Sequence, residues 1–168
     1  MTKQEFAKIA MALQTFYPRE NMFKTDQETE LWYDMLEDIP YDVAQIGIKK
    51  WVATNKWPPS IAEIRSMAQT VTFGETKDWG KAWEEVINSI GAYGIYHVKE
   101  ALEMFDDLTR EAVERVGYRN ICMSENIMTE RANFRMIYEQ LAERKTKNDQ
   151  LSPKLRELIG NTQKALEG

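Results

Sequence analysis

The residues that could do chemistry in this chain are few, and their spacing matches no catalytic motif. Gly74 and the pair Gly80–Lys81 are spaced almost as in a phosphate-binding loop, in which backbone N–H groups and a lysine hold phosphate oxygens. Five residues separate the two glycines instead of about four, and Ala82 stands where a Ser or Thr would hold Mg²⁺. No predicted strand leads into this stretch. We therefore interpret it as a loop glycine followed by a surface lysine.

The sequence gives equally little support to a metal site or an activated nucleophile. His97 is the only histidine and Cys122 the only cysteine, whereas zinc and di-iron sites use several His, Cys or Glu ligands. No histidine neighbours Cys122 in the sequence, so we expect its thiol to act as a small apolar group. The many carboxylates fall on the polar faces of amphipathic patterns, where exposure to solvent accounts for them. We therefore predict that the protein is not an enzyme and that it uses no cofactor and no metal.

Basic side chains are concentrated in one part of the chain. The stretch from Arg131 to Lys164 holds 8 Lys or Arg and 4 Asp or Glu, in a chain whose net charge is −5. A basic stretch can follow a phosphate backbone, but the acidic whole favours a helix surface of mixed charge. The possible nucleic-acid contacts are Arg131, Arg135, Arg144, Lys145 and Lys147.

The composition narrows the class of protein further. The chain has 168 residues, of which 43% are apolar and 29% charged, as in one ordinary globular domain or two small ones. No apolar run approaches the roughly 18 residues that a membrane span needs. The N-terminal stretch lacks the basic start, apolar core and cleavage site of a signal peptide. A single cysteine suits a reducing compartment, so we expect a cytoplasmic protein without membrane contact.

Apolar positions recur at helical spacing along nearly the whole chain, and no segment alternates as a strand would. Capping boxes, in which an N-cap side chain and a Glu three residues later bond each other's backbone N–H, mark helix starts. The three predicted boxes are Thr2 with Glu5, Thr25 with Glu28, and Ser60 with Glu63. The predicted fold class is all-α, with a small N-terminal helical bundle followed by a second set of helices.

The predicted domains follow from where the helical pattern stops. We place the N-terminal helical bundle at residues 1–70, a linker at 71–77 and a C-terminal helical region at 78–168. Within that region the polar stretch "ERKTKNDQ", residues 143–150, is expected to separate a long helix from a last one. Ser152 is the predicted N-cap of this last helix, with Pro153 at its first helical position.

The stretch "WPPSIAEIR", residues 57–65, predicts a firm corner in the N-terminal bundle. Pro58 and Pro59 stop one helix, because proline lacks an N–H and biases the residue before it to extended geometry. Ser60 then caps the next helix, and Ile64 can pack back over the entry. We expect Trp57 to cover this corner. The stretch is thus interpreted as architecture and not as a binding loop.

Two long stretches carry a resemblance to a known family. The sequences "MTKQEFAKIAMALQTFYP" and "LWYDMLEDIPYDVAQIGIKKWVATNKWPPSIAEIRSMA" contain a first helix ending in Tyr-Pro, a helix with Trp-Tyr-x-x-Leu, and the segment "PPSIAEIR". Together they resemble the phage-encoded replicative helicase loader/inhibitor family, which lacks an ATPase domain. The resemblance covers about residues 1–70.

This resemblance implies a small helical protein that binds a hexameric DnaB-type helicase of the bacterial host, inhibits it and loads it at the origin. A phage origin-binding initiator protein is a possible second partner. In the family the helicase contact is associated with the C-terminal portion, and the last predicted helix carries a Leu/Ile face. An amphipathic helix of this kind can lie in a partner's groove or dock onto its own bundle. The candidate helicase contacts are Leu155, Arg156, Leu158 and Ile159.

Two other functions stay open at this point. One is a helical DNA-binding replication or regulatory protein, whose affinity would fall steeply with salt and depend on the basic stretch. The other is a phage assembly or chaperone-like interaction protein, which would have no effect on a helicase. Nine methionines suit any surface that must repack around a protein partner.

Overall fold

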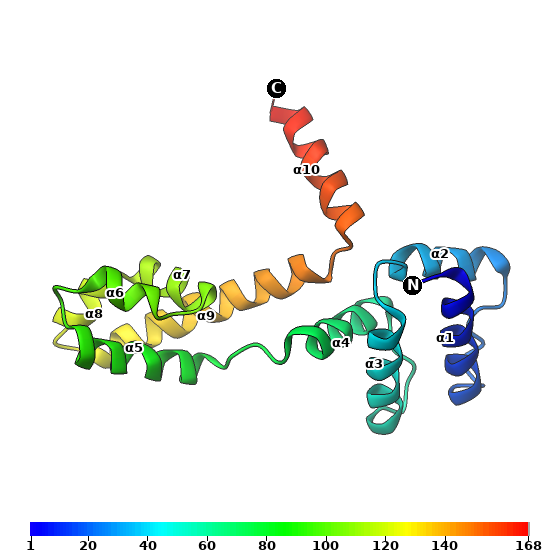
Figure 1. Cartoon of the computed structure of the whole chain (residues 1–168), viewed down its shortest axis with the longest axis horizontal. Coiled ribbons are helices and arrows are strands. Elements are labelled where there is room, and N and C mark those ends of the chain that lie inside the picture. Colours follow the sequence, from blue (N-terminus) through cyan, green and yellow to red (C-terminus); the bar gives the residue numbers. More distant parts are fainter. Residues whose placement is uncertain (168) are drawn as a thin grey trace. The chain divides into compact units, whose positions relative to one another are not determined.

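The computed structural model describes residues 1–167, and helices are the regular elements throughout these residues (Figure 1). The absence of strands from this part of the chain confirms the predicted all-α class. Within the same residues, every helix is too short or too polar to span a membrane. The helices are α1 Lys3–Phe16, α2 Asp26–Leu36, α3 Tyr41–Thr54, α4 Ile61–Phe73, α5 Trp79–Tyr93, α6 Val98–Glu103, α7 Asp107–Val116, α8 Tyr118–Met123, α9 Ile127–Gln150 and α10 Pro153–Glu167.

The helices form two compact units, which we describe separately. Unit 1 contains residues 1–75 and the residues from 147 onward, and unit 2 contains residues 76–146. The domains expected from the sequence differ from these units in one respect, because they grouped the last helix with the C-terminal region. Helix α4 also continues to Phe73, with Gly74 at its C-terminus in a left-handed conformation (φ 81°), so the linker expected at 71–77 starts later.

The core of unit 1 forms where the apolar faces of α1 to α4 meet. Phe6 and Leu13 of α1, Leu36 of α2 and Ile64 of α4 are almost fully buried. The Phe23 ring contacts the Phe6 ring edge-on, with 6.0 Å between the ring centroids. These side chains lie at the spacing that the sequence pattern used to predict the helices. The N-terminal helical bundle is therefore held together by the predicted apolar faces.

The helix starts of unit 1 follow the predicted capping boxes in two of three places. Both bonds of the box are present for Thr2 with Glu5 and for Ser60 with Glu63. At Thr25 only the side-chain bond to the Glu28 N–H forms, at 3.1 Å. The Glu28 carboxylate instead accepts from the backbone N–H of the preceding residue, Lys24. The third predicted box is thus half formed, because the carboxylate reaches one residue too far back.

The proline corner is a turn into α4, as expected, but Trp57 does not cover it. Pro59 and Ile64 are buried, whereas the Trp57 side chain is 62% exposed. The backbone carbonyl of Trp57 accepts a hydrogen bond from the Trp51 indole N–H at 2.8 Å. The backbone of Trp57 therefore holds the corner, and its indole ring faces solvent.

Unit 2 has its own core, built from α5 to α8 and most of α9. The rings of Trp83 and Tyr138 both pack against the Phe134 ring, with centroid separations of 5.3 and 5.6 Å. The Tyr138 hydroxyl donates to the Lys77 carbonyl at 2.9 Å. The Lys77 ammonium also forms ion pairs with Glu85 and Asp106. These bonds fix the segment that leads into α5.

The polar stretch at residues 143–150 is helical, which corrects the prediction of a connector there. Helix α9 continues through this stretch to Gln150. The side chains are mainly those of Glu, Arg and Lys, which favour a helix even without an apolar face. The break comes at the next residues, where the Ser152 hydroxyl accepts from the Leu155 N–H at 3.2 Å. Ser152 and Pro153 thus start α10 as predicted.

Candidate partner-binding site

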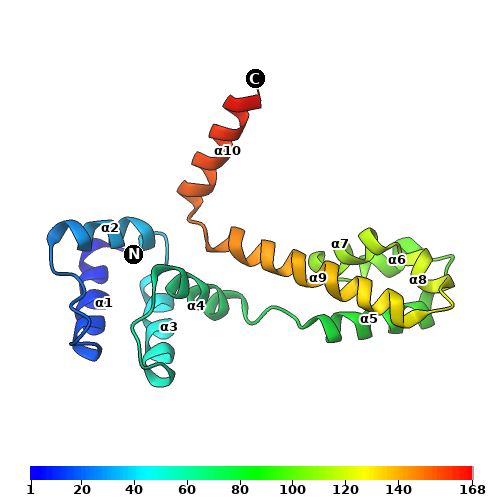
Figure 2. The ribbon, with the colours of Figure 1, turned by 180° about the vertical axis from the view of Figure 1, so that it is seen from behind.

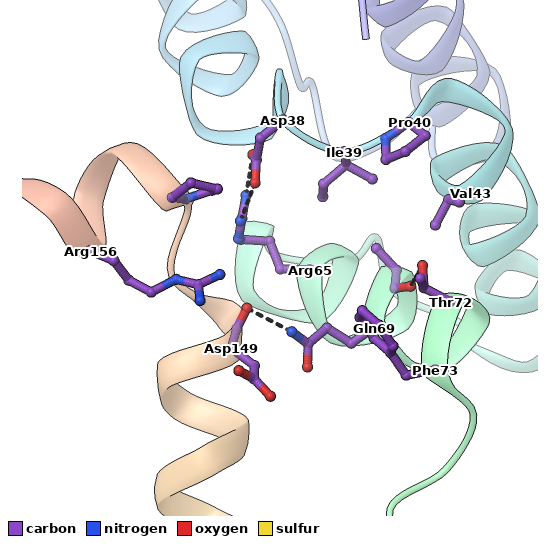
Figure 3. A pocket seen from close by; sticks show the side chains of 12 residues that line it. Asp38, Ile39, Pro40, Val43, Arg65, Gln69, Thr72, Phe73, Asp149 and Arg156 are labelled. Atoms are coloured by element: carbon purple, nitrogen blue, oxygen red, sulfur yellow. Dashed lines mark hydrogen bonds and ion pairs between the residues drawn. The ribbon is translucent and has the colours of Figure 1, made fainter.

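Unit 1 contains a pocket of about 250 Å³ where the segment between α2 and α3, helix α4 and the start of α10 meet (Figure 3). Ile39, Val43 and Ala68 supply apolar walls. Phe73 stands at its edge and is 83% exposed. Arg156, one of the four candidate helicase contacts, lines the pocket from the side of α10. The pocket thus joins the part of unit 1 before residue 75 to its C-terminal part.

Arg65 is the central polar residue of this pocket. It is 6% exposed, and its guanidinium forms a two-point ion pair with the Asp38 carboxylate, at 2.7 and 2.8 Å. The same guanidinium donates to the backbone carbonyls of Met35 and Gln150. Burial raises the pKa of the Asp38 carboxyl, but the Arg65 hydrogen bonds and charge outweigh burial, so this pKa lies below its usual value. The pair is therefore ionised at neutral pH.

A second side chain of α4 holds the end of α9. The Gln69 amide donates to the Asp149 carbonyl at 2.7 Å, beside the bond from Arg65 to Gln150 (Figure 3). The last carbonyls of a helix lack partners inside the helix, so side chains that bind them fix where the helix ends. Helix α10 therefore starts from a defined place on unit 1.

The remaining side of the pocket is polar and positively charged. The Arg156 side chain donates from Nε to the Leu151 carbonyl at 3.2 Å, which leaves the outer nitrogens of its guanidinium available. Apolar walls beside an exposed guanidinium suit a partner's apolar side chain that lies next to a carboxylate. The pocket can therefore accept a protein side chain, whereas it holds no group arranged for acid–base or nucleophilic chemistry.

Most of the apolar face of α10 is uncovered. Leu158 is 63% exposed, Ile159 39% and Leu166 82%, whereas Leu155 is half-buried. In both ribbon views α10 leaves the rest of unit 1 after its first turn, with no other helix of that unit along its length (Figures 1 and 2). The alternative in which α10 docks its apolar face onto its own bundle is not the arrangement seen here.

The basic residues suggested by the sequence fall into two groups. Arg131 and Arg135 both stack on the Trp79 ring, at 5.2 and 4.9 Å from its centroid. Arg135 also pairs with Glu139 at 2.9 Å. The other three, Arg144, Lys145 and Lys147, are exposed on the last turns of α9. The structure thus brings Arg131 and Arg135 together on one aromatic ring.

Sequence reasoning missed the polar residues of the pocket, although one signal was present. Arg65 lies on the same helical face as Ile61, Ile64 and Ala68, which pack in the core. A charged residue on an apolar face is buried only with a partner. That pattern indicates a carboxylate elsewhere in the fold, but only the structure identifies it as Asp38.

The other residues considered for chemistry have simple structural roles. Among residues 1–167, no group of three His, Cys, Asp or Glu side chains is arranged to hold a metal ion. The Asp78 carboxylate accepts from the Gly80 N–H at 2.8 Å, so it stands where a phosphate would be needed in a phosphate-binding loop. His97 is exposed beside Glu100. Burial raises the pKa of the Cys122 thiol, which is not an activated nucleophile.

Comparison with known proteins agrees with the resemblance over the first part of the chain. Residues 1–65 match the family described as the N-terminal domain of a phage helicase loader/inhibitor. The match confirms the suspected family over that segment. No curated protein and no solved structure matched the chain. The match ends at Arg65, the residue that holds both Asp38 and the end of α9.

Proposed function

We propose that this chain is a phage DNA-replication protein that binds a hexameric DnaB-type helicase of its host, inhibits it and loads it at the origin. It would act in the host cytoplasm through protein–protein contacts. The observation that carries the proposal is an uncovered apolar helix, α10, on a chain whose residues 1–65 match a helicase loader/inhibitor domain. A phage initiator protein is the further partner that this role requires at the origin.

The exposed side chains of α10 supply a physical reason for binding. Leu158 and Ile159 are adjacent and mainly exposed, and burying one such side chain fully contributes about 1.5–3 kcal/mol. An amphipathic helix in a partner's groove uses this arrangement of anchors. Arg156 and the adjoining pocket extend the surface with a charged edge, as expected around an apolar centre. We therefore assign the helicase contact to Leu155, Arg156, Leu158 and Ile159.

A mechanism follows from binding energy alone. A protein that binds one conformation of the helicase ring more tightly than another shifts the ring toward the first conformation. Inhibition then corresponds to a stalled or open ring that is held by the bound protein. Release at the origin corresponds to loss of that contact when an initiator protein competes for it. This scheme uses no nucleotide bound to the chain.

Deletion of residues 151–168 tests the proposal. The deletion retains Asp149 and Gln150, whose carbonyls accept the bonds from Gln69 and Arg65, so the rest of unit 1 keeps these anchors. We expect the truncated protein to keep its helical circular dichroism spectrum and to stop co-eluting with the helicase in size-exclusion chromatography. Unchanged co-elution of a folded truncated protein would remove α10 from the interface.

A further inference from the structure

We propose that unit 2 carries a second protein-docking surface, which binds an acidic amphipathic helix of another protein. This Trp79 surface consists of Trp79 on α5 and Ile127, Met128, Arg131 and Arg135 on α9. The proposal does not depend on the helicase, and it concerns a different unit from α10. It assigns two of the basic residues to protein binding instead of nucleic-acid binding.

The first argument is the geometry of the two guanidiniums. Arg131 and Arg135 both lie over the Trp79 ring, with centroid distances of 5.2 and 4.9 Å. Stacking uses the flat face of a guanidinium and leaves its in-plane N–H donors free to bind a carboxylate at two points. It also restricts two long side chains before binding, which lowers the entropy cost of association. Trp and Arg are the residue types enriched where binding energy is concentrated.

The second argument is charge. Within residues 1–167, Arg131 has no carboxylate at ion-pair distance, and Arg135 has only Glu139. Arg131 and Arg135 are one helical turn apart, so they match two carboxylates that are one turn apart on a partner helix. An exposed guanidinium with no ionic partner on its own chain is the group that an acidic partner complements.

The third argument is the apolar surface next to the arginines. Ile127 and Met128 are 41% and 63% exposed. They lie four and three residues before Arg131, and therefore on the same side of α9. A partner helix that presents two carboxylates to the arginines can cover these side chains with an apolar residue in its next turn. Methionine adapts to such a surface because its side chain is unbranched.

Nucleic acid fits this surface less well than an acidic protein segment. Unit 2 carries 10 Lys or Arg and 13 Asp or Glu, so its net charge is −3. Glu130 and Glu139 flank the two arginines on α9 and would repel a phosphate backbone. Both faces of the proposed contact therefore favour discrete carboxylates over a continuous polyanion.

Binding of two labelled probes to the full chain tests the proposal by fluorescence anisotropy. One probe is a helical peptide with Glu residues four apart beside Leu, and its control has Gln in place of Glu. The other is single-stranded oligodeoxythymidine. We expect the Glu peptide to bind at least about tenfold tighter than the Gln peptide and than the oligonucleotide.

Variants on α9 separate the proposed surface from general charge. The double variant Arg131→Gln/Arg135→Gln should weaken Glu-peptide binding about tenfold or more. Arg144→Gln/Lys145→Gln makes the same charge change on the same helix and should alter binding less than about twofold. Trp79→Leu keeps both charges but removes the stack, and should also weaken binding while the circular dichroism spectrum is retained. Equal losses in the two double variants, no preference for the Glu peptide, or tighter binding of the oligonucleotide would overturn the proposal.

Discussion

The Arg65 guanidinium and the Asp38 carboxylate meet at two points, at 2.7 and 2.8 Å, although the two residues are 27 positions apart in the chain. This contact joins the segment between α2 and α3 to α4. The same guanidinium binds the carbonyl of Gln150, the last residue of α9. One side chain thus stabilises unit 1 and also fixes the point from which α10 starts.

Replacing Arg65 by Met should strongly destabilise unit 1. The change removes the partner of a largely buried carboxylate, and such a change typically costs about 3–5 kcal/mol. Urea unfolding of the full chain, followed by circular dichroism, measures the loss. Arg19→Met removes an exposed arginine of the same unit and should change the free energy of unfolding by less than about 0.5 kcal/mol. Equal effects of the two variants would show that the ion pair is unimportant for stability.

The same pair predicts how stability depends on pH. The pKa of the Asp38 carboxyl is lower in the folded chain than the usual unfolded value of about 3.9. Its contribution is therefore fully present above that value and is lost as the pH falls through the folded pKa. Urea unfolding between about pH 6 and pH 2 should show a shallower acid decline for Asp38→Asn than for the wild type. Parallel curves for the two proteins would contradict this assignment.

Ser60→Ala should reduce the free energy of unfolding by roughly 1 kcal/mol. The Ser60 hydroxyl accepts from the Glu63 N–H at 3.3 Å, and the Glu63 carboxylate accepts from the Ser60 N–H at 2.7 Å. Thermal or urea unfolding measures the change, and helicase binding should stay within about twofold because the corner is architectural. Normal stability with lost binding would instead make the corner a contact site.

Two glycines of helices should respond to substitution in opposite ways. A Cβ at Gly47 of α3 would lie 3.1 Å from the Met67 Cβ of α4, so Gly47→Val should cost about 1–3 kcal/mol. Gly91 of α5 has open space around it, and Gly91→Ala should stabilise the chain by up to about 1 kcal/mol. Urea unfolding of both variants provides the comparison. Similar effects at the two sites would mean that α3 and α4 do not pack as closely as described.

Local signals in the sequence predicted the local features of the fold. The caps at Thr2 and Ser60, the helix end at Gly117 and the start of α10 at Ser152 all depend on neighbouring residues. The helix through residues 143–150 was missed because apolar periodicity was used to find helices, and this stretch is polar. A propensity argument from its Glu, Arg and Lys residues would have found it.

The candidate site depends on contacts between residues far apart in the chain. The bonds from Arg65 to Asp38 and Gln150 span 27 and 85 positions, which no local pattern specifies. The sequence identified the apolar face of α10 but left open whether its own bundle covers it. Only the exposure of Leu158 and Ile159 in the folded chain separates these alternatives. The assignment of this face to a helicase stays a prediction.

The central claim is that the uncovered face of α10 binds the helicase, and one affinity measurement tests it most directly. The variant Leu158→Ser/Ile159→Ser changes two mainly exposed side chains, so the chain should remain folded. Phe16→Ser/Leu31→Ser alters similarly exposed apolar residues elsewhere in unit 1 and serves as the matched control. Binding to a hexameric DnaB-type helicase of the host is measured by surface plasmon resonance. The account predicts a loss of at least about tenfold for the α10 variant and none for the control. Wild-type affinity in the α10 variant would contradict it.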